Sequence, residues 1–124
     1  MPSSRSILST GGLLLAAAMT LGAFGAHGLA AHVTADRIPV YDTAVRYHFW
    51  NALGLLAIGI TARFSDSRLL AASAWLVIAG ILLFSGSLYL LTFGAPRAIG
   101  LLTPVGGVAL IGGWIVYAVA ARRA

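Results

Sequence analysis

The sequence predicts an all-α fold: an integral membrane four-helix bundle whose antiparallel neighbours are joined by short loops. Composition is the first reason, because 60% of the 124 residues are apolar and only 9% are charged. Soluble domains have about 45–50% apolar residues, with glycine included, and about 25% charged residues. The second reason is that four long apolar stretches follow one another, and the third is that the links between them are brief. Too few charges are present to cover a water-soluble globule.

The charged residues are of few kinds: eight arginines and three aspartates, with no lysine and no glutamate. A net charge of +5 would favour nucleic acid if the arginines lay together on one polar face. They stand singly or in pairs between apolar runs, which is typical of the charges that orient membrane helices. We therefore expect the lipid bilayer, and no nucleic acid, as a partner. The absence of cysteine excludes a disulfide framework, a thiolate zinc site and a cysteine nucleophile.

The four predicted helices span residues 7–29, 44–62, 69–93 and 99–121, and together make one transmembrane domain over residues 1–124. A helix needs about 20 apolar residues to cross a hydrocarbon core of about 30 Å. Three stretches reach that length, and the second reaches it only if its polar first turns lie among the headgroups. Helices are required because lipid offers the backbone no hydrogen-bond partner, and no stretch alternates like a barrel strand.

The links set the topology. Residues 63–68 and 94–98 are too few to join anything but antiparallel neighbours. The first link, residues 30–43, is longer and holds two of the three aspartates, so it has room for a short interfacial helix.

Orientation follows from the arginines, since four spans place both termini on one side. Five arginines lie on that side and three on the other, which predicts cytoplasmic termini in the inner (plasma) membrane. The five are Arg5, Arg63, Arg68, Arg122 and Arg123, and the three are Arg37, Arg46 and Arg97.

A cleavable signal peptide is the alternative for the first stretch. Arg5, the apolar run at 11–23 and the small residues at 28–30 imitate one, and cleavage would leave three helices. The apolar run is long enough to span a membrane, which favours an uncleaved helix.

Small residues are spaced for close helix contact, which is a main source of helix association in lipid. They predict a compact bundle, with a leftover face that drives oligomerisation as the alternative. The packing positions are Gly22, Ala26, Gly86, Gly106 and Gly113.

Thr103 and Pro104 occur early in the fourth stretch. Threonine as N-cap with proline at the first helical position is a normal helix start. A broken helix, as at transporter binding sites, is the alternative.

The second helix carries the polar residues most suited to a functional site. Asp42 and Arg46 are four residues apart with the acid first, so they can pair along one helix face. Tyr41, His48 and Asn51 lie nearly opposite. The helix thus has two polar stripes on opposite faces, and both cannot point into one bundle interior. One stripe must therefore contact lipid headgroups, another chain or a water-filled cavity.

These residues also have ordinary structural explanations. Asp42 suits the first turn of a helix, Arg46 can reach lipid phosphates, and Tyr47 and Trp50 suit the interfacial aromatic belt. The alternative is a functional ion pair, because ionisable groups at membrane depth are costly.

Histidines complete the candidate polar cluster. His27 ends the first helix, where it suits a cap or the interface, or it joins His48 in a proton or metal site. His32 has poor helical spacing for a shared ligand set. Three histidines without cysteine or a paired acid are a weak metal signal, so we expect no metal and no cofactor. The sequence contains no recognisable set of catalytic residues, so we expect no enzyme.

Four segments resemble the YgdD/YwdK family, domain of unknown function 423, which groups small four-helix bacterial membrane proteins with a eukaryotic transmembrane relative. They are GAFGAHGL at 22–29, YDTAVRYHFWNALGLL at 41–56, GSLYLL at 86–91 and TPVGGVALIGGW at 103–114. The resemblance implies an uncleaved first helix and a plasma-membrane location, and it implies no activity, substrate or cofactor. Trp50 is bulkier than the family pattern, which affects the packing of that face.

Two hypotheses for function follow. The first is a non-enzymatic accessory or structural subunit that docks against a membrane-protein partner or against itself. The second is an oligomeric small-solute or ion transporter or channel, with His27, Arg46, His48 and Asn51 lining a polar outer mouth.

Overall fold

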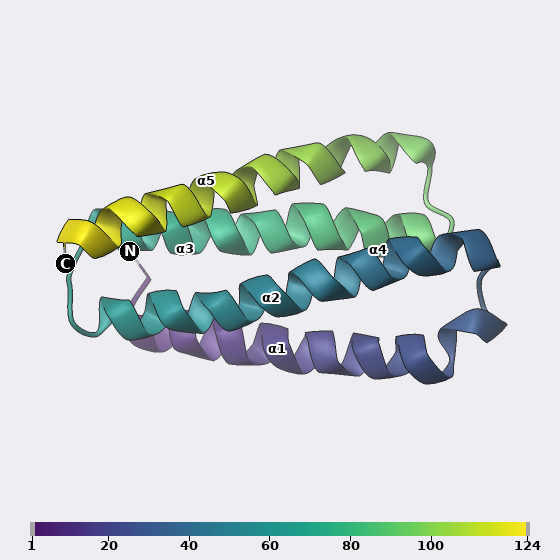
Figure 1. Cartoon of the computed structure of the whole chain (residues 1–124), viewed down its shortest axis with the longest axis horizontal. Helices are drawn as coiled ribbons and strands as arrows, with labels where there is room; N and C mark the ends of the chain where they lie inside the picture. The colour runs from purple at the N-terminus through teal and green to yellow at the C-terminus, as the bar shows by residue number, and fades with distance from the viewer. Residues whose placement is uncertain (1, 124) are drawn as a thin grey trace.

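The computed structural model describes residues 2–123, and these residues form four long helices and no strand. The first two are α1 (Ser4–His27) and α2 (Ile38–Ala62). The third is continuous through α3 (Arg68–Gly80), a π-helical segment (Ile81–Ser85) and α4 (Gly86–Thr92). The fourth is α5 (Leu102–Arg123). An all-α chain of four helices is therefore confirmed (Figure 1).

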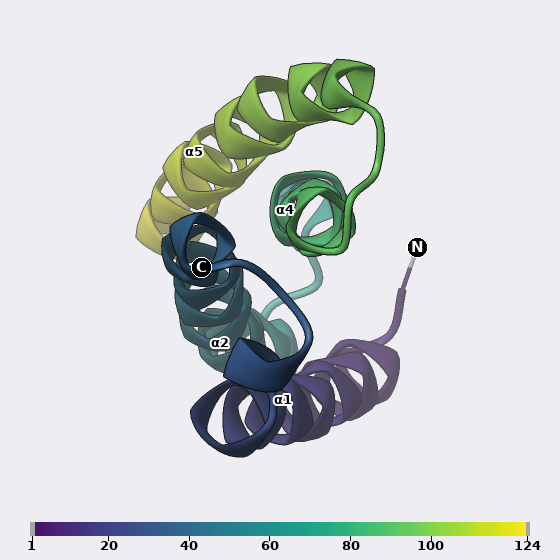
Figure 2. The same ribbon diagram turned by 90° about the vertical axis from the view of Figure 1, so that its right-hand side faces the viewer.

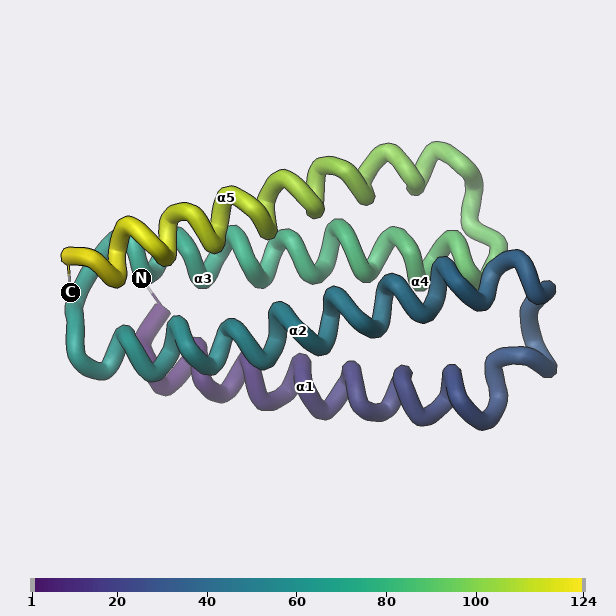
Figure 3. Tube along the Cα trace, in the orientation of Figure 1, coloured from purple at the N-terminus to yellow at the C-terminus, as the bar shows by residue number. Residues whose placement is uncertain are grey.

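The helices lie side by side along the long axis of the molecule, and the loops alternate between its two ends (Figures 1 and 3). Both chain ends lie at one end, here called the terminal end, and the opposite end is called the distal end (Figure 1). α1 packs mainly on α2, and α5 packs mainly on α3. Figure 2 shows α1 and α5 on opposite sides of the pair formed by α2 and α4.

The first link is shorter than the sequence predicts, because α2 begins at Ile38 rather than at residue 44. Pro39 lies in its first turn, a position where a missing N–H costs nothing. Two 3₁₀ turns, Leu29–Ala31 and Ala35–Arg37, fill the link in place of one interfacial helix. The 25 residues of α2 extend for about 37 Å.

The start of α5 corrects the predicted cap. A 3₁₀ segment (Arg97–Leu101) leads directly into the helix at Leu102, so Thr103 lies inside α5 instead of capping it. Its hydroxyl forms a hydrogen bond with the hydroxyl of Ser87 on α4. The helix is continuous past Pro104, so the alternative of a broken fourth helix is wrong.

Glycines bring α5 close to the third helix. A Cβ on Gly106 would lie 2.3 Å from the backbone nitrogen of Phe84, and one on Gly113 would lie 3.0 Å from a Val77 methyl. Gly86 differs from its predicted role, because a Cβ there would meet nothing within 4 Å. A Cβ on Gly22 would make only an ordinary contact, 3.5 Å from Val45.

The apolar core lies where α1, α2, the third helix and α5 meet. Large side chains are exposed around the outside, and Val108 on α5 is 71% exposed. The core consists of Ile7, Leu55, Ile58, Ala74, Val77, Ile81 and Leu110. In the described chain three segments are long and apolar enough to cross a membrane: Ser4–His27, Arg68–Thr92 and Arg97–Arg123. α2 is the long helix that falls short of this criterion, and it carries the candidate residues.

Candidate functional site

Buried polar side chains of α2 meet polar groups of the third helix and α5 in what we call the polar seam. Its members are Tyr41, His48, Asn51, Ser85, Tyr89 and Trp114. His48 is only 4% exposed and Asn51 only 8% exposed. They share the face of α2 that also buries Ala44, Ala52 and Leu55.

His48 is the seam's central residue. Its Nδ1 and the hydroxyl of Tyr89 lie 2.8 Å apart in a hydrogen bond that joins α2 to α4. The other ring nitrogen, Nε2, is buried without a hydrogen-bond partner of good geometry in the described chain, although the backbone of Leu14 on α1 lies beside the ring. His48 therefore has one satisfied nitrogen and one that is not, an arrangement that is costly in an apolar interior.

The remaining bonds of the seam tie α2 to each of its neighbours. Tyr41 donates its hydroxyl proton to the carbonyl of Leu21 on α1. Ser85, the last residue of the π-helical segment, donates to the carbonyl of Ala44 over 2.8 Å. Trp114 on α5 donates its indole N–H to Oδ1 of Asn51 over 2.7 Å. The Asn51 amide in turn donates to the carbonyl of Tyr47, also over 2.7 Å.

The opposite side of α2 carries Asp42 and Arg46, and both are exposed. They line a groove between α1 and α2 that we call the charged groove. Its distal part has a volume of about 450 Å³ and includes Asp42, and its inner part has about 360 Å³ and includes Trp50. Arg46 lines both parts. No ion pair joins Asp42 to Arg46 or to another side chain in the described residues.

The structure thus divides the α2 residues into the two stripes that the sequence indicates. It does not bring His27 and His48 together, so the alternative of a shared histidine site gains no support from the structure. His48 lies beside Leu14, whereas the exposed His27 lies about 20 Å further along α1 at a rise of 1.5 Å per residue. Within one chain, the four residues predicted to line the mouth of an oligomeric channel do not converge on one place.

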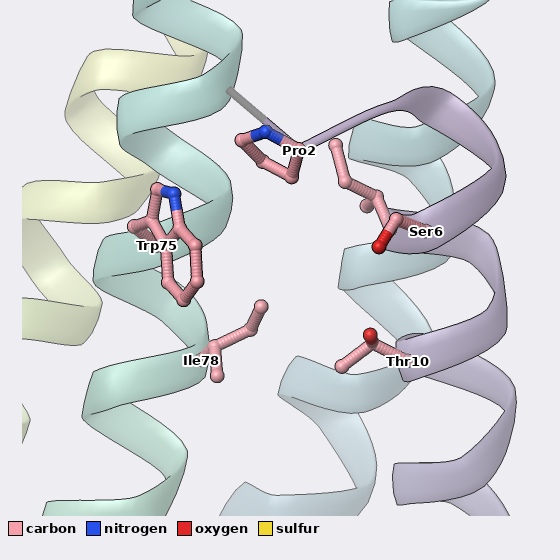
Figure 4. A pocket seen from close by; sticks show the side chains of 6 residues that line it. Pro2, Ser6, Thr10, Trp75 and Ile78 are labelled. Atoms are coloured by element: carbon pink, nitrogen blue, oxygen red, sulfur yellow. The ribbon is translucent and has the colours of Figure 1, made fainter.

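Two further features of the described residues concern metal ligands and pockets. Within residues 2–123, no group of three or more His, Cys, Asp or Glu side chains could hold a metal ion. A crevice between α1 and α3, near the terminal end, has a volume of about 390 Å³. Figure 4 shows side chains that line it. Ser6, Thr10 and Trp75 line it together with apolar side chains, and no ionisable side chain does.

Sequence reasoning missed the partners of α2 on the other helices. Ser85 and Tyr89 are four residues apart and so share a helix face, a spacing that could have identified them. Trp114 gave no local signal, because only the packing of α5 reveals its bond to Asn51.

Four helices, three of them apolar enough to cross a membrane, with polar groups gathered in one seam, define an all-helical membrane protein. The comparisons agree with this class. The chain belongs to the family described as "Protein of unknown function (DUF423)", whose model matches residues 21–107. That range includes every residue of the seam except Trp114, and all of the charged groove except Ala18 and Met19.

Relatives are similar over most of their length. The chain is 44% identical to the UPF0382 membrane protein YwdK of Bacillus subtilis, over 86% of this chain and 87% of the relative. It is 43% identical to the UPF0382 membrane protein SSP2132 of Staphylococcus saprophyticus, over 82% and 84% respectively. It is 42% identical to a UPF0382 membrane protein of Haemophilus influenzae, over 81% and 80%. No solved structure matches the chain.

Proposed function

We propose that this protein is a non-enzymatic accessory or structural subunit of the cytoplasmic membrane, which acts through a helix–helix interface on its charged groove. All four helices cross the bilayer as an antiparallel bundle within one domain, and both termini are cytoplasmic. The arginine distribution of five against three supports this orientation. The second span is α2, which is about 37 Å long and therefore exceeds the hydrocarbon thickness.

The observation that carries the proposal is the exposure of Asp42 and Arg46 on α2. Asp42 lies about 6 Å and Arg46 about 12 Å from the start of the helix. By contrast, the buried Tyr41 and Asn51 side chains of α2 are hydrogen-bonded within the chain. Ionisable groups in membrane helices normally pair or face a wet cavity. A docked protein segment supplies the partner that the chain itself does not.

The polar seam serves as the internal frame of this surface. It joins α2 to α1, to α4 and to α5. These bonds fix the rotation of α2, and that rotation turns Asp42 and Arg46 outward. The seam has a structural role in this proposal, so no substrate or cofactor is required.

Replacing Asp42 or Arg46 with alanine is expected to weaken assembly, because each change removes one charge from the docking surface. The measurement is the size and composition of the complex extracted from native membranes in mild detergent, by sizing and mass spectrometry. Arg63→Ala is the matched control, since Arg63 is an exposed arginine that follows α2 at the terminal end, away from the groove. Wild-type assembly in both groove variants would contradict the proposal.

A further inference from the structure

The charged groove is one continuous surface along the contact of α1 with α2. Its distal and inner parts share Gly22, Val45 and Arg46. The α1 side is built from small residues at four-residue intervals, Ala18, Gly22 and Ala26. Small residues at such spacing let the backbone of another helix approach closely in lipid. Small residues alone do not identify the occupant, but the charges on the α2 side do.

The α2 side carries both signs of charge on adjacent turns. Asp42 lies about 6 Å closer to the start of the helix than Arg46. Both are exposed, and no ion pair within the described chain neutralises either. A lipid phosphate would satisfy Arg46 and would repel Asp42. The surface therefore fits an occupant that presents an acid and a base together, at the spacing of Arg46 and Asp42.

We propose that the occupant of the charged groove is a second copy of this chain, related by a two-fold axis along the membrane normal. This inference rests on the proposed function and names its partner. Every copy has the same orientation in the membrane, so the two α2 helices run parallel and present identical surfaces to each other. A two-fold contact is self-complementary, with each residue pair occurring twice.

Arg46 then pairs with Asp42 of the other copy. In a helix the Cα–Cβ bond leans toward the amino-terminal end, so the long Arg46 side chain extends toward the level of Asp42. The symmetry forms this pair twice, and all four charges are neutralised. Trp50 and Met19, which are 55% and 63% exposed, line the inner part of the groove and add apolar contact beyond the charges.

Exchanging charges between two copies tests this pairing. Asp42→Arg gives a chain with two bases in the groove, and Arg46→Asp gives a chain with two acids. Each variant alone is expected to lose self-association by at least about tenfold, because like charges then face each other in both pairs. The two variants mixed together are expected to associate with each other, since both pairs are again of opposite sign.

The measurement is energy transfer between two fluorescent labels on full-length chains reconstituted in liposomes, for each variant alone and for the mixture. The control pair is Arg63→Asp with Asp66→Arg, which changes exposed charges in the loop between α2 and α3. Self-association of the control variants like that of the wild type is expected. Gly22→Leu fills the groove and leaves its charges intact, and it is expected to prevent association. It keeps the proposal testable if a charge variant does not fold.

The outcomes are distinct. Rescue in the mixture, with neither single variant associating, supports the second copy as occupant. Wild-type self-association of either single charge variant overturns it. A monomeric wild-type chain also overturns it. If the alanine variants of Asp42 and Arg46 still lose a larger native complex in that last case, the proposed function stands with a different partner.

Discussion

Gly106→Ala is expected to destabilise the protein by about 1–3 kcal/mol or more, as overpacking of a tight core does. The added Cβ would lie 2.3 Å from the backbone nitrogen of Phe84 and 2.8 Å from the carbonyl carbon of Leu83. These are backbone atoms of the π-helical segment, so no side-chain rotation relieves the clash. α5 must move away from the third helix instead. The measurement is the free energy of unfolding in detergent micelles, from a denaturant titration followed by circular dichroism.

Gly112→Ala is the matched control on the same helix. A Cβ there would meet nothing within 4 Å, and alanine has the higher helix propensity. We expect this variant to be as stable as the wild type or slightly more stable. Equal losses at both glycines would show that the close approach at Gly106 does not exist.

Tyr89→Phe is the second large effect, because it leaves both nitrogens of His48 without a partner of good geometry. A buried polar group left unsatisfied costs about 1–3 kcal/mol. The double variant Tyr89→Phe with His48→Leu removes both polar partners, and such replacements are often nearly neutral. We therefore expect the second change to recover most of the stability that the first one loses.

The measurement for this pair is the same detergent unfolding titration, together with sizing of the native assembly. If the seam is structural, the double variant regains both stability and assembly. A double variant that is stable but no longer supports assembly would contradict the structural role and give His48 a function of its own.

The existence of the helices could be predicted from the sequence, because long apolar runs with few charges have few alternatives in lipid. Boundaries were less accurate where polar residues continue a helix. α2 begins at Ile38, ahead of the predicted start, and the polar side chains in the added turns find acceptors: Tyr41 bonds to α1 and Thr43 to the carbonyl of Pro39. A hydropathy pattern cannot detect that compensation.

The division of α2 into two polar stripes could also be predicted, since it depends only on helical periodicity. The partners of each stripe could not. The π-helical segment is one reason: its wider turn changes which side chains of the third helix face α2, and no glycine or proline signal within Ile81–Ser85 indicates it. The position of His27 relative to His48 could not be predicted for a similar reason. The sequence does not show which turn of α1 packs beside which turn of α2.

Photo-crosslinking from the charged groove tests the central claim, a protein docking surface on the α1–α2 side, most directly. A photoreactive residue at Ala23, which is exposed in the inner part of the groove, reports on that surface in native membranes. The same residue at Val108, which is 71% exposed on α5, is the control. We expect a discrete protein adduct from Ala23, none from Val108, and loss of the Ala23 adduct when Arg46 is replaced by alanine. Crosslinking to lipid alone at Ala23, or an adduct that persists without Arg46, would contradict the claim.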